Sequence, residues 1–560
     1  MAPGIRDAVP GTIHLVDTDH HTLHQGDIVL NPRPSADPED PLNWPRWRKQ
    51  RAIWMVYIYV FGISISTAVQ YSVLADIAAE GISYSALNTG AGLMFLFLGW
   101  ACLVWQPIAL VFGRRGVYIL SSLLSIGPMV WTAYSKTNGD WYGHRILIGL
   151  FAAPTESLPE VSVPDLFFAH ERGYYIGIYA LFVFGGNSLA PFFAGFIADA
   201  MGWQAAIWFG TIVLIVCTVI VFFGLEETMY FRETIEGVDE GDAVTEEVAV
   251  QTATSKNVTP DQKTAVPAEK NEKNETTVLK AGSETGAAPV GESVTYYSTP
   301  PRTYLQNLAL FRSLRGRPSV QQMLVMMYRP LLMILHFPTV VWAGFLYGVN
   351  LSWYNVVNAT MSLVLSAAPY NFSTSAVGLG FLSVFVGAVL GALWAGWVGD
   401  RVALYLARRN GGIREPEHRL WVLVFSAVVG AAGFILWGVG AAHQVQFMGL
   451  IVGVGMVEFA VVAGGSTALA YDIDSFKEIA GESLILVIIV RNTLGFGFSY
   501  GITPWLNSQG LTDTFVAVGM LSFGCTMTFL FFIVFGKAIR RWSAKMYWEY
   551  TDTLVVRGAH

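Results

Sequence analysis

The chain has 560 residues, of which 53% are hydrophobic and 14% aromatic, while Asp, Glu, Lys and Arg together make up only 13%. Soluble proteins carry about 25% charged residues, so this composition excludes a series of water-soluble domains. The formal net charge is −7, and the sequence has no basic stripe of the kind that binds nucleic acid. With a mean hydropathy of +0.47, the sequence predicts an all-α integral membrane protein.

Apolar windows of transmembrane length occur twelve times, taking about 20 residues as the length that crosses the bilayer core. They fall into two sets of six, separated by a long polar stretch. The first set lies at approximately 53–75, 89–111, 116–135, 142–163, 174–197 and 203–224. The second set lies at approximately 331–354, 375–398, 420–441, 446–470, 484–506 and 514–536. We therefore expect twelve transmembrane helices in two six-helix halves.

Basic residues indicate which side of the membrane each loop faces. They gather before the first span, after the second and fourth, between the eighth and ninth, and after the twelfth, whereas the loops on the other side hold almost only Lys136. Both termini and the polar stretch are therefore expected in the cytoplasm. The predicted N-terminal tail, first half, linker, second half and C-terminal tail are residues 1–51, 52–225, 226–328, 329–537 and 538–560.

The linker has no Phe, Trp or Tyr between Glu236 and Thr295 and is rich in Thr, Glu, Lys and Ala. Such a stretch cannot bury enough apolar surface to offset the entropy lost on ordering, so we expect it to be largely disordered. Its role as a plain tether or as a phosphorylation platform is open. Residues 302–327 are basic and intermittently apolar, which predicts an amphipathic helix at the membrane surface.

Two related elements follow the second helix of each half, on the predicted cytoplasmic side. Their residues of interest are Gly113, Arg114, Arg115, Gly396, Asp400 and Arg401. The matching positions indicate an internal duplication. The elements resemble the loop signature of the major facilitator superfamily, roughly G-x-x-x-D-R-x-G-R-R, which implies the two-half major facilitator fold. The first copy has Leu110 and Val111 where Asp and Arg would stand. The alternative is that these basic residues only set topology.

The predicted fourth helix places Arg145, Gly149, Glu156 and Glu160 on one face. Arg145 and Glu156 are eleven residues apart, close to three helical turns, and Glu160 follows four residues later. Charges at membrane depth normally face a water-filled cavity or a partner. We expect a substrate or proton site on this face, with structural pairing of the two glutamates to neighbouring helices as the alternative. Arg145 and Gly149 also match the R-x-x-x-G element of the superfamily.

The predicted fifth helix contains the run GGNSLAPFFAG, with Gly186, Pro191 and Gly195. Small residues allow helices to approach closely, and a proline bends a helix. The run resembles the antiporter signature of twelve-helix drug:proton exchangers, G-x-x-x-G-P-x-x-G-G, with Ala190 and Ala194 in place of two glycines. Ordinary packing of small residues is the alternative.

The tenth and eleventh helices supply three further candidates for the site. Glu458 lies near the middle of its span, where a carboxyl group favours its protonated form and suits a proton carrier. Arg491 and Asn492 lie about two turns into the next span. Arg491 is expected either to contact substrate or to pair with Glu458 or Glu478.

More of the chain resembles a narrower branch, the fungal drug:proton antiporter-1 type transporters, which also holds polyamine- and histidinol-type permeases. The runs that carry this resemblance are GTIHLVDTDHHTLHQGDIVLNPRPSADPEDPLNWPRWRK, DLFFAHERG, ARRNGGIREPEHRL and YDIDSFKE followed by RNTLGFGF. The resemblance covers nearly the whole chain apart from the central linker. It implies a monomeric transporter in the lipid bilayer that needs no cofactor and draws its energy from a proton gradient.

We find no nucleotide-binding loop, metal motif or catalytic motif in the sequence, so an enzyme is not expected. The leading hypothesis is a proton-coupled exporter of a secondary metabolite or drug, working by alternating access. The alternatives are an importer of a small nutrient, such as a polyamine or an amino-acid-like compound, and a nutrient receptor that does not transport. The plasma membrane is the expected location, with peroxisomal or vacuolar membranes as alternatives. Asn371 is a candidate glycosylation site in a predicted outer loop.

Overall fold

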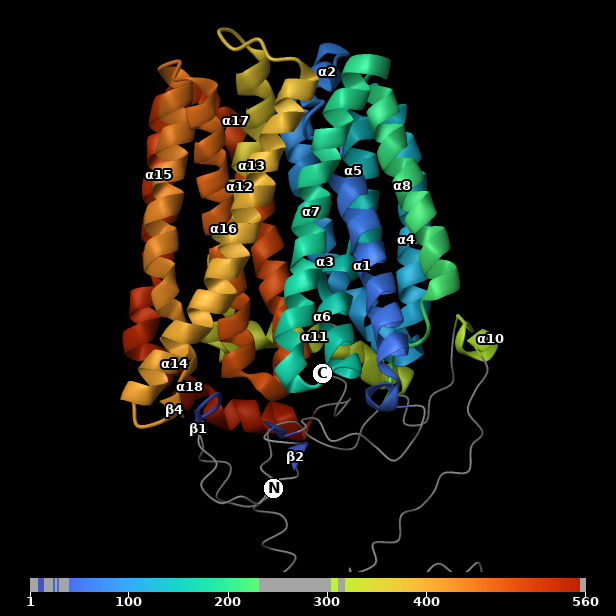
Figure 1. Ribbon diagram of the computed structural model, residues 1–560, viewed down its shortest axis with the longest axis vertical. Coiled ribbons are helices and arrows are strands. Elements are labelled where there is room, and N and C mark those ends of the chain that lie inside the picture. The colour runs from blue at the N-terminus through green and yellow to red at the C-terminus, as the bar shows by residue number, and fades with distance from the viewer. Residues whose placement is uncertain are drawn as a thin grey trace, which may run out of the picture. The chain divides into compact units, whose positions relative to one another are not determined.

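The structure is a computed structural model that describes residues 9–14, 24–25, 28–29, 40–230, 304–310 and 318–553. Most of the predicted linker, and with it the prediction of disorder, lies outside these residues. In the first half, the helices are α1 (Arg46–Ala68), α2 (Leu74–Ala79), α3 (Tyr84–Phe112), α4 (Arg114–Ala133), α5 (Asn138–Ala152), α6 (Pro154–Leu166), α7 (Ala169–Met201) and α8 (Trp203–Gly224). Except for the short α2, they form the blue-to-green bundle of Figure 1.

The second half forms the yellow-to-red bundle beside it (Figure 1). Its helices are α11 (Val320–His336), α12 (Pro338–Ser366), α13 (Thr374–Leu393), α14 (Gly399–Arg409), α15 (Leu423–Ala442), α16 (Phe447–Ser475), α17 (Ala480–Met527) and α18 (Phe529–Asp552). The single turn α10 (Tyr304–Asn307), in the predicted linker, lies instead against the first half, where Tyr304 donates to the carbonyl of Phe223. The residues between α13 and α14, Trp394–Val398, are π-helical. Short 3-10 turns cover Pro41–Asn43, Pro416–Val422 and Lys477–Ile479.

Within the described residues, ten helical segments are long and apolar enough to cross a membrane, and the bent pair α11–α12 adds an eleventh. The last of the ten runs from Lys477 to Asp552 and is interrupted at Gly510, whose φ of 75° is non-helical. Before this point α17 contacts both ends of α3, and after it the chain returns to the start of α12, where Trp342 donates to Thr528. A chain that returns in this way crosses twice, which gives the twelve expected spans.

The start of the seventh span differs from the prediction. The membrane helix begins at Pro338 rather than near residue 331, and α11 meets α12 at an angle of 97°. Proline has no N–H to continue a helix, and Phe337 adopts a non-helical backbone at the junction. The predicted surface helix at 302–327 is replaced by the single turn α10 and by α11, which reaches His336.

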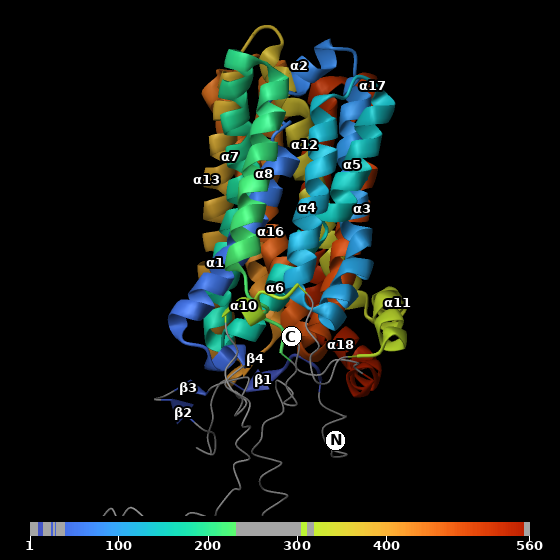
Figure 2. The same ribbon diagram turned by 90° about the vertical axis from the view of Figure 1, so that its right-hand side faces the viewer.

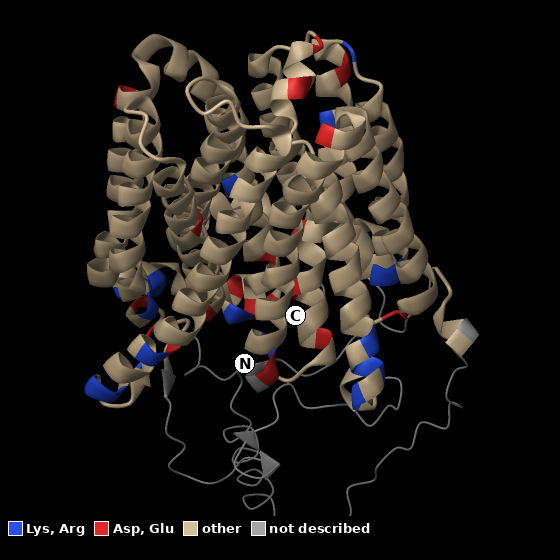
Figure 3. Ribbon diagram, turned by 45° about the horizontal axis from the view of Figure 1, so that its top comes forward, with Lys and Arg blue, Asp and Glu red and all other residues tan. Residues whose placement is uncertain are grey.

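Two contacts run along the length of the molecule and join the halves: α3 packs on α17, and α7 packs on α13. Figure 2 shows α7 and α13 side by side. Lys and Arg gather at the end of the bundle that holds α14 and α18 (Figures 1 and 3). We call this the basic end and the other the opposite end. The positive-inside rule assigns the basic end to the cytoplasm.

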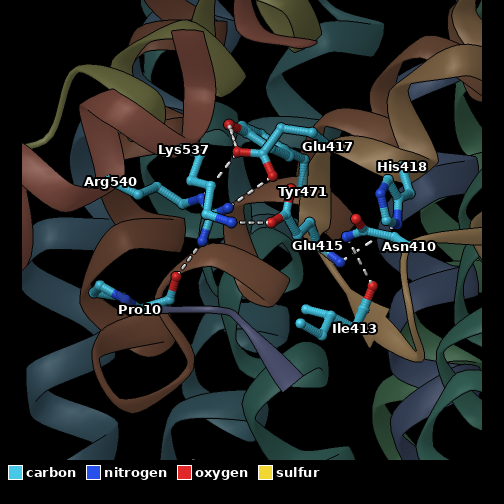
Figure 4. A network of polar contacts seen from close by, with 9 residues as sticks. All are labelled: Pro10, Asn410, Ile413, Glu415, Glu417, His418, Tyr471, Lys537 and Arg540. Atoms are coloured by element: carbon cyan, nitrogen blue, oxygen red, sulfur yellow. Dashed lines mark hydrogen bonds and ion pairs between the residues drawn. The ribbon is translucent and has the colours of Figure 1, made fainter. Parts of the chain in front are cut away.

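At the basic end, the N-terminal segment 9–14 is bound to the second half. Strand β1 (Ile13–His14) pairs antiparallel with β4 (Ile413–Arg414) in the loop after α14. Arg540 of α18 donates to the carbonyl of Pro10 and, at 2.9 and 2.7 Å, to both oxygens of Glu417 (Figure 4). Separately, β2 (His24–Gln25) and β3 (Ile28–Val29) pair with each other. The sequence analysis assigned residues 9–14, 24–25 and 28–29 to the N-terminal tail and predicted none of these contacts.

Candidate functional site

An ion pair between Arg491 and Glu156 joins the two halves in the interior. Glu156 lies in the first turn of α6 and Arg491 in α17, and their side chains are 22% and 5% exposed. The guanidinium also lies over the ring of Tyr347 in α12, 4.6 Å from its centroid. The neighbouring Asn492 is fully buried where α17 meets Gly99 of α3. The carboxylate that pairs with Arg491 is therefore Glu156, on the fourth predicted span.

Glu160 lies one turn beyond Glu156 and has no such direct partner. Its Oε2 is buried and has no hydrogen-bond partner among the residues that the structure describes. It lies within the electrostatic reach of Glu156, Arg491 and Asp472. Asp472 of α16 is buried as well and accepts a hydrogen bond from Ser483 at 2.7 Å. Glu160 thus lies near two other carboxyl groups and one guanidinium, and burying several carboxylates together in ionised form is costly.

Glu458 is buried elsewhere, in the middle of α16. Only 2% of the residue is exposed, and its Oε1 has no hydrogen-bond partner within the described part of the chain. Glu458 packs closely on Gly387 of α13: a Cβ at Gly387 would lie 3.1 Å from the Cβ of Glu458. The polar side chain in its electrostatic reach is Tyr354 of α12. In the described residues Glu458 forms no ion pair, so its ionised form is expensive where it stands.

Arg145 faces a different part of the interior from Glu156 and Glu160. Its guanidinium lies over Trp141, 4.7 Å from the ring centroid, and Nη1 is 3.8 Å from Sδ of Met94. Its Nε and Nη2 have no hydrogen-bond acceptor among the described residues. A cavity of about 10 Å³, lined also by Tyr71, Asn88 and Asn355, lies beside it. This is room for about one water molecule.

Gly149 explains how α5 approaches α3 beside this cavity. A Cβ at Gly149 would stand 2.2 Å from the carbonyl oxygen of Met94, closer than any side chain tolerates. The four residues predicted on one face of the fourth helix therefore contact two different parts of the interior. Arg145 and Gly149 face α3 and the small cavity, whereas Glu156 and Glu160 face the charged groups of the second half.

The two related elements at the basic end bond to residues near them in the chain or to acidic residues packed against the same half. Gly113 ends α3 with a φ of 108°, and Glu227 accepts the backbone N–H groups of Arg114 and Arg115 at 3.0 and 3.1 Å. Arg114 also pairs with buried Asp165 at 2.5 Å. Acidic partners from later in the chain thus face the first copy, which lacks an aspartate of its own.

The second copy uses its own aspartate. Asp400, in the first turn of α14, forms an ion pair with Arg419. Arg401 lies over Trp397, 3.6 Å from the ring centroid, and Gly396 lies in the π-helical segment that precedes it. Within the part of the chain that the structure describes, these residues of neither copy bond to the helices of the other half, and Arg115 also donates to the carbonyl of Leu308 in the linker.

The small residues of α7 form close contacts on two sides. A Cβ at Gly186 would lie 2.6 Å from Ser64 of α1, within the first half. A Cβ at Gly195 would lie 2.5 Å from the carbonyl oxygen of Thr374, and one at Gly378 would lie 2.8 Å from that of Pro191. Pro191 and Gly195 therefore lie where α7 crosses α13 of the second half.

Several residues at these contacts were missed by sequence reasoning. Tyr347 is one of 23 tyrosines and has no distinguishing neighbours. Asp472 lies two residues beyond the predicted end of the tenth span at residue 470, so hydropathy placed it outside the membrane, whereas α16 continues to Ser475. Asp76 and Asp199 bond across the halves at the opposite end. Asn371 is exposed in the loop between α12 and α13, and its glycosylation remains a prediction.

The fold and this interior define a membrane transport protein with two helical halves around a charged centre. Residues 56–473 match the Major Facilitator Superfamily, and the chain belongs to that family. An uncharacterized MFS-type transporter of Schizosaccharomyces pombe is 30% identical, covering 98% of this chain and 95% of that protein. Protein HOL1 of Saccharomyces cerevisiae is 28% identical over 97% of each. Fungal relatives at 21 and 22% identity include proteins named as an efflux pump and an antiporter.

Among solved structures, the E. coli xylose transporter XylE, in a partially occluded inward-open conformation, superposes with a TM-score of 0.53. The match covers 87% of this chain and 98% of that one, at 12% identity. This similarity concerns the fold alone.

Proposed function

We propose that the chain is a proton-coupled secondary transporter that exports a small organic molecule by alternating access. The observation that carries the proposal is the Arg491–Glu156 pair, buried on its arginine side, which joins the halves beside Glu160. A pair of this kind is strong only while both charges are present. Protonation of a carboxyl group, or arrival of a charged substrate, therefore changes the attraction between the halves.

The charges of the centre favour a substrate that carries a positive charge. Glu156, Glu160 and Asp472 outnumber Arg491, and Glu458 adds a fourth carboxyl group deeper in α16. A protonated amine can satisfy one of these carboxylates and compete with Arg491 for Glu156. The ring of Tyr347 offers a cation a further favourable surface. An organic cation and protons would then occupy the same carboxyl groups in turn, as exchange requires.

Two observations support export as the direction and antiport as the mode. The run in α7 that resembles the antiporter signature places Pro191 and Gly195 at the crossing with α13, so it lies between the halves that must move. Relatives named as an efflux pump and an antiporter match most of the chain. For such a protein, secondary metabolites and drugs bearing an amine are the expected cargo, and the plasma membrane is the expected site.

Glu458→Gln tests the coupling. The amide mimics the protonated carboxyl group, so a proton carrier at this position would be fixed in one state. We expect proteoliposomes containing this variant to lose accumulation of organic cations driven by an imposed pH gradient, while keeping exchange of labelled for unlabelled cation. A panel of amines and their neutral analogues identifies the substrate in the same assay.

Glu549→Gln is the matched control, since Glu549 is an exposed carboxylate on α18, 55% accessible. It should accumulate substrate as the wild type does. If Glu458→Gln accumulates substrate with unchanged pH dependence, the proton site must be Glu156 or Glu160. If neutralising all three leaves accumulation driven by the pH gradient unchanged, none of the three carries the coupled proton and the coupling proposed for them is wrong.

A further inference from the structure

At the opposite end, two aspartates of the first half bond to the first turn of a helix of the second half. Asp76 lies in α2 and accepts from the hydroxyl of Thr374 at 3.0 Å. Asp199 lies near the end of α7 and accepts from the backbone N–H of Ser375 at 2.9 Å. Thr374 and Ser375 are the first two residues of α13. We call these four residues the carboxylate latch.

The latch lies beside the contacts that close this end. The backbone N–H of Ala75 donates to Ser362 of α12 at 3.3 Å, and Asn88 of α3 donates to Thr503 of α17 at 2.9 Å. Ser72 and Ser362 are each only 1% exposed. Gly195, one turn before Asp199, lets α7 reach the carbonyl of Thr374. The halves therefore meet closely at the latch, and Ser72 is shielded from water.

Two effects act on the latch carboxylates in opposite directions. The N-terminus of a helix attracts negative charge, so α13 favours one carboxylate at its first turn. A second carboxylate on the adjacent residue adds like-charge repulsion. Burial raises the pKa of Asp76 above its ordinary value, the hydrogen bond from Thr374 lowers it, and the charge of Asp199 raises it again. Tyr84 of α3 is a further titratable group in electrostatic reach of Asp76.

The direction of the pH effect depends on how the pKa of Asp76 differs between the closed and open states. When the halves separate at this end, Asp76 faces water and its pKa returns toward the ordinary value. The closed state therefore binds the proton more tightly than the open state, and lowering the pH on this side favours closure. Raising the pH ionises Asp76 beside Asp199 and favours opening.

We propose that the carboxylate latch is a second proton site, in which uptake of a proton by Asp76 from the outer medium closes the opposite end of the transporter. The proposal rests on the function proposed above, because a gate matters only if the halves move. In this proposal the proton from the outer medium controls the closing step of the exchange cycle. After substrate has left, acid outside shuts the exit and returns the central site to the basic end.

The test measures access to the closed end without measuring transport. Ser72→Cys is introduced after Cys102, Cys217 and Cys525 have been replaced, and whole cells are treated with a membrane-impermeant maleimide at pH 5.5 and about pH 7.5. Thiols react faster as pH rises, so each rate is divided by that of Ser508→Cys, which is exposed near the turn at Gly510. We expect the ratio to rise with pH, by up to about tenfold for each pKa unit that separates the two states.

Asp76→Asn should hold this ratio at its acid value at both pH values, because the amide mimics the protonated carboxyl group. Asp199→Ala removes the acceptor for Ser375 and should raise the ratio at both. A ratio that still rises with pH in Asp76→Asn would overturn the proposal. So would a wild-type ratio independent of pH. If the labelling ratios follow these expectations but the protein carries out no proton-coupled transport, the proposed function is wrong and the latch proposal stands.

Discussion

Arg491 is the only cation paired with the carboxylates of the central site in the described part of the chain, and 5% of its side chain is exposed. Arg491→Gln would leave Glu160, whose Oε2 is buried, and the largely buried Glu156 without a counter-charge. Removing one partner of a buried pair costs about 3 kcal/mol or more, so we expect a clear fall in the thermal unfolding midpoint of the detergent-solubilised protein, followed by tryptophan fluorescence.

The double variant Arg491→Gln/Glu156→Gln removes both charges and is the control for this expectation. Replacing a buried pair by neutral groups is often nearly neutral for stability, so the double variant should be more stable than the single one. Equal destabilisation would show that packing of the long arginine side chain against Tyr347, rather than charge, stabilises the site.

At this scale the sequence predicted residue types better than partners. Charges inside apolar runs made Glu156, Glu160, Glu458 and Arg491 candidates without any structure, because ionised groups are rare at membrane depth. The partner of Arg491 was not predictable, since Glu156 lies 335 positions away and no periodicity connects the two helices. The same holds for Asp76 and Asp199, which lie near helix ends, where acidic residues are ordinary.

Among the elements, α7 uses its small residues for two contacts. Gly186 packs on α1 of the same half, and Gly195 packs on α13 of the other half. Gly195→Ala would place a Cβ 2.5 Å from a backbone oxygen of α13, so the two halves must separate locally. We expect a loss of about 1–3 kcal/mol, seen as a lower unfolding midpoint, together with faster labelling of Ser72→Cys.

Gly177→Ala is the matched change in the same helix, because no atom lies within 4 Å of the position where its Cβ would stand. Alanine favours a helix interior over glycine by about 0.5–1 kcal/mol, so this variant should be as stable as the wild type or slightly more so. If both variants behave alike, the contact of Gly195 with Thr374 does not hold the opposite end closed.

Element boundaries show where hydropathy stops being informative. The twelve spans were predictable because apolar length is set by the bilayer. The 97° bend between α11 and α12 was not, because the inner face of a surface helix and a membrane helix are equally apolar. The identity of Pro338 marks the junction, but Pro107, Pro128 and Pro191 lie inside continuous helices, so a proline alone does not locate a break.

For the whole molecule, the contact between segment 9–14 and the second half predicts an effect of removing the N-terminus. Arg540 is fully buried and divides its hydrogen bonds between Glu417 and the carbonyl of Pro10. Deleting residues 1–14 removes one bond to a charged group, worth about 1.5–3 kcal/mol. We expect a lower unfolding midpoint while the chain still inserts into the membrane.

Lys545→Ala serves as the control, because Lys545 is on the same helix, is 86% exposed and lies 4.0 Å from Glu549 on the helix surface. Such pairs contribute little, and the variant should unfold as the wild type does. An unchanged midpoint in the deletion variant would mean that water replaces Pro10 at Arg540 without cost.

The position of Pro10 also concerns the order of synthesis. Pro10 and Arg540 are 530 positions apart in the chain, so the ribosome makes the segment before any membrane helix and its arginine partner after all of them. The segment has no β4 to pair with until most of the chain has been made, and no Arg540 until nearly all of it has. Its docking is therefore among the last steps of biogenesis, and a docked N-terminus reports that the second half has been completed.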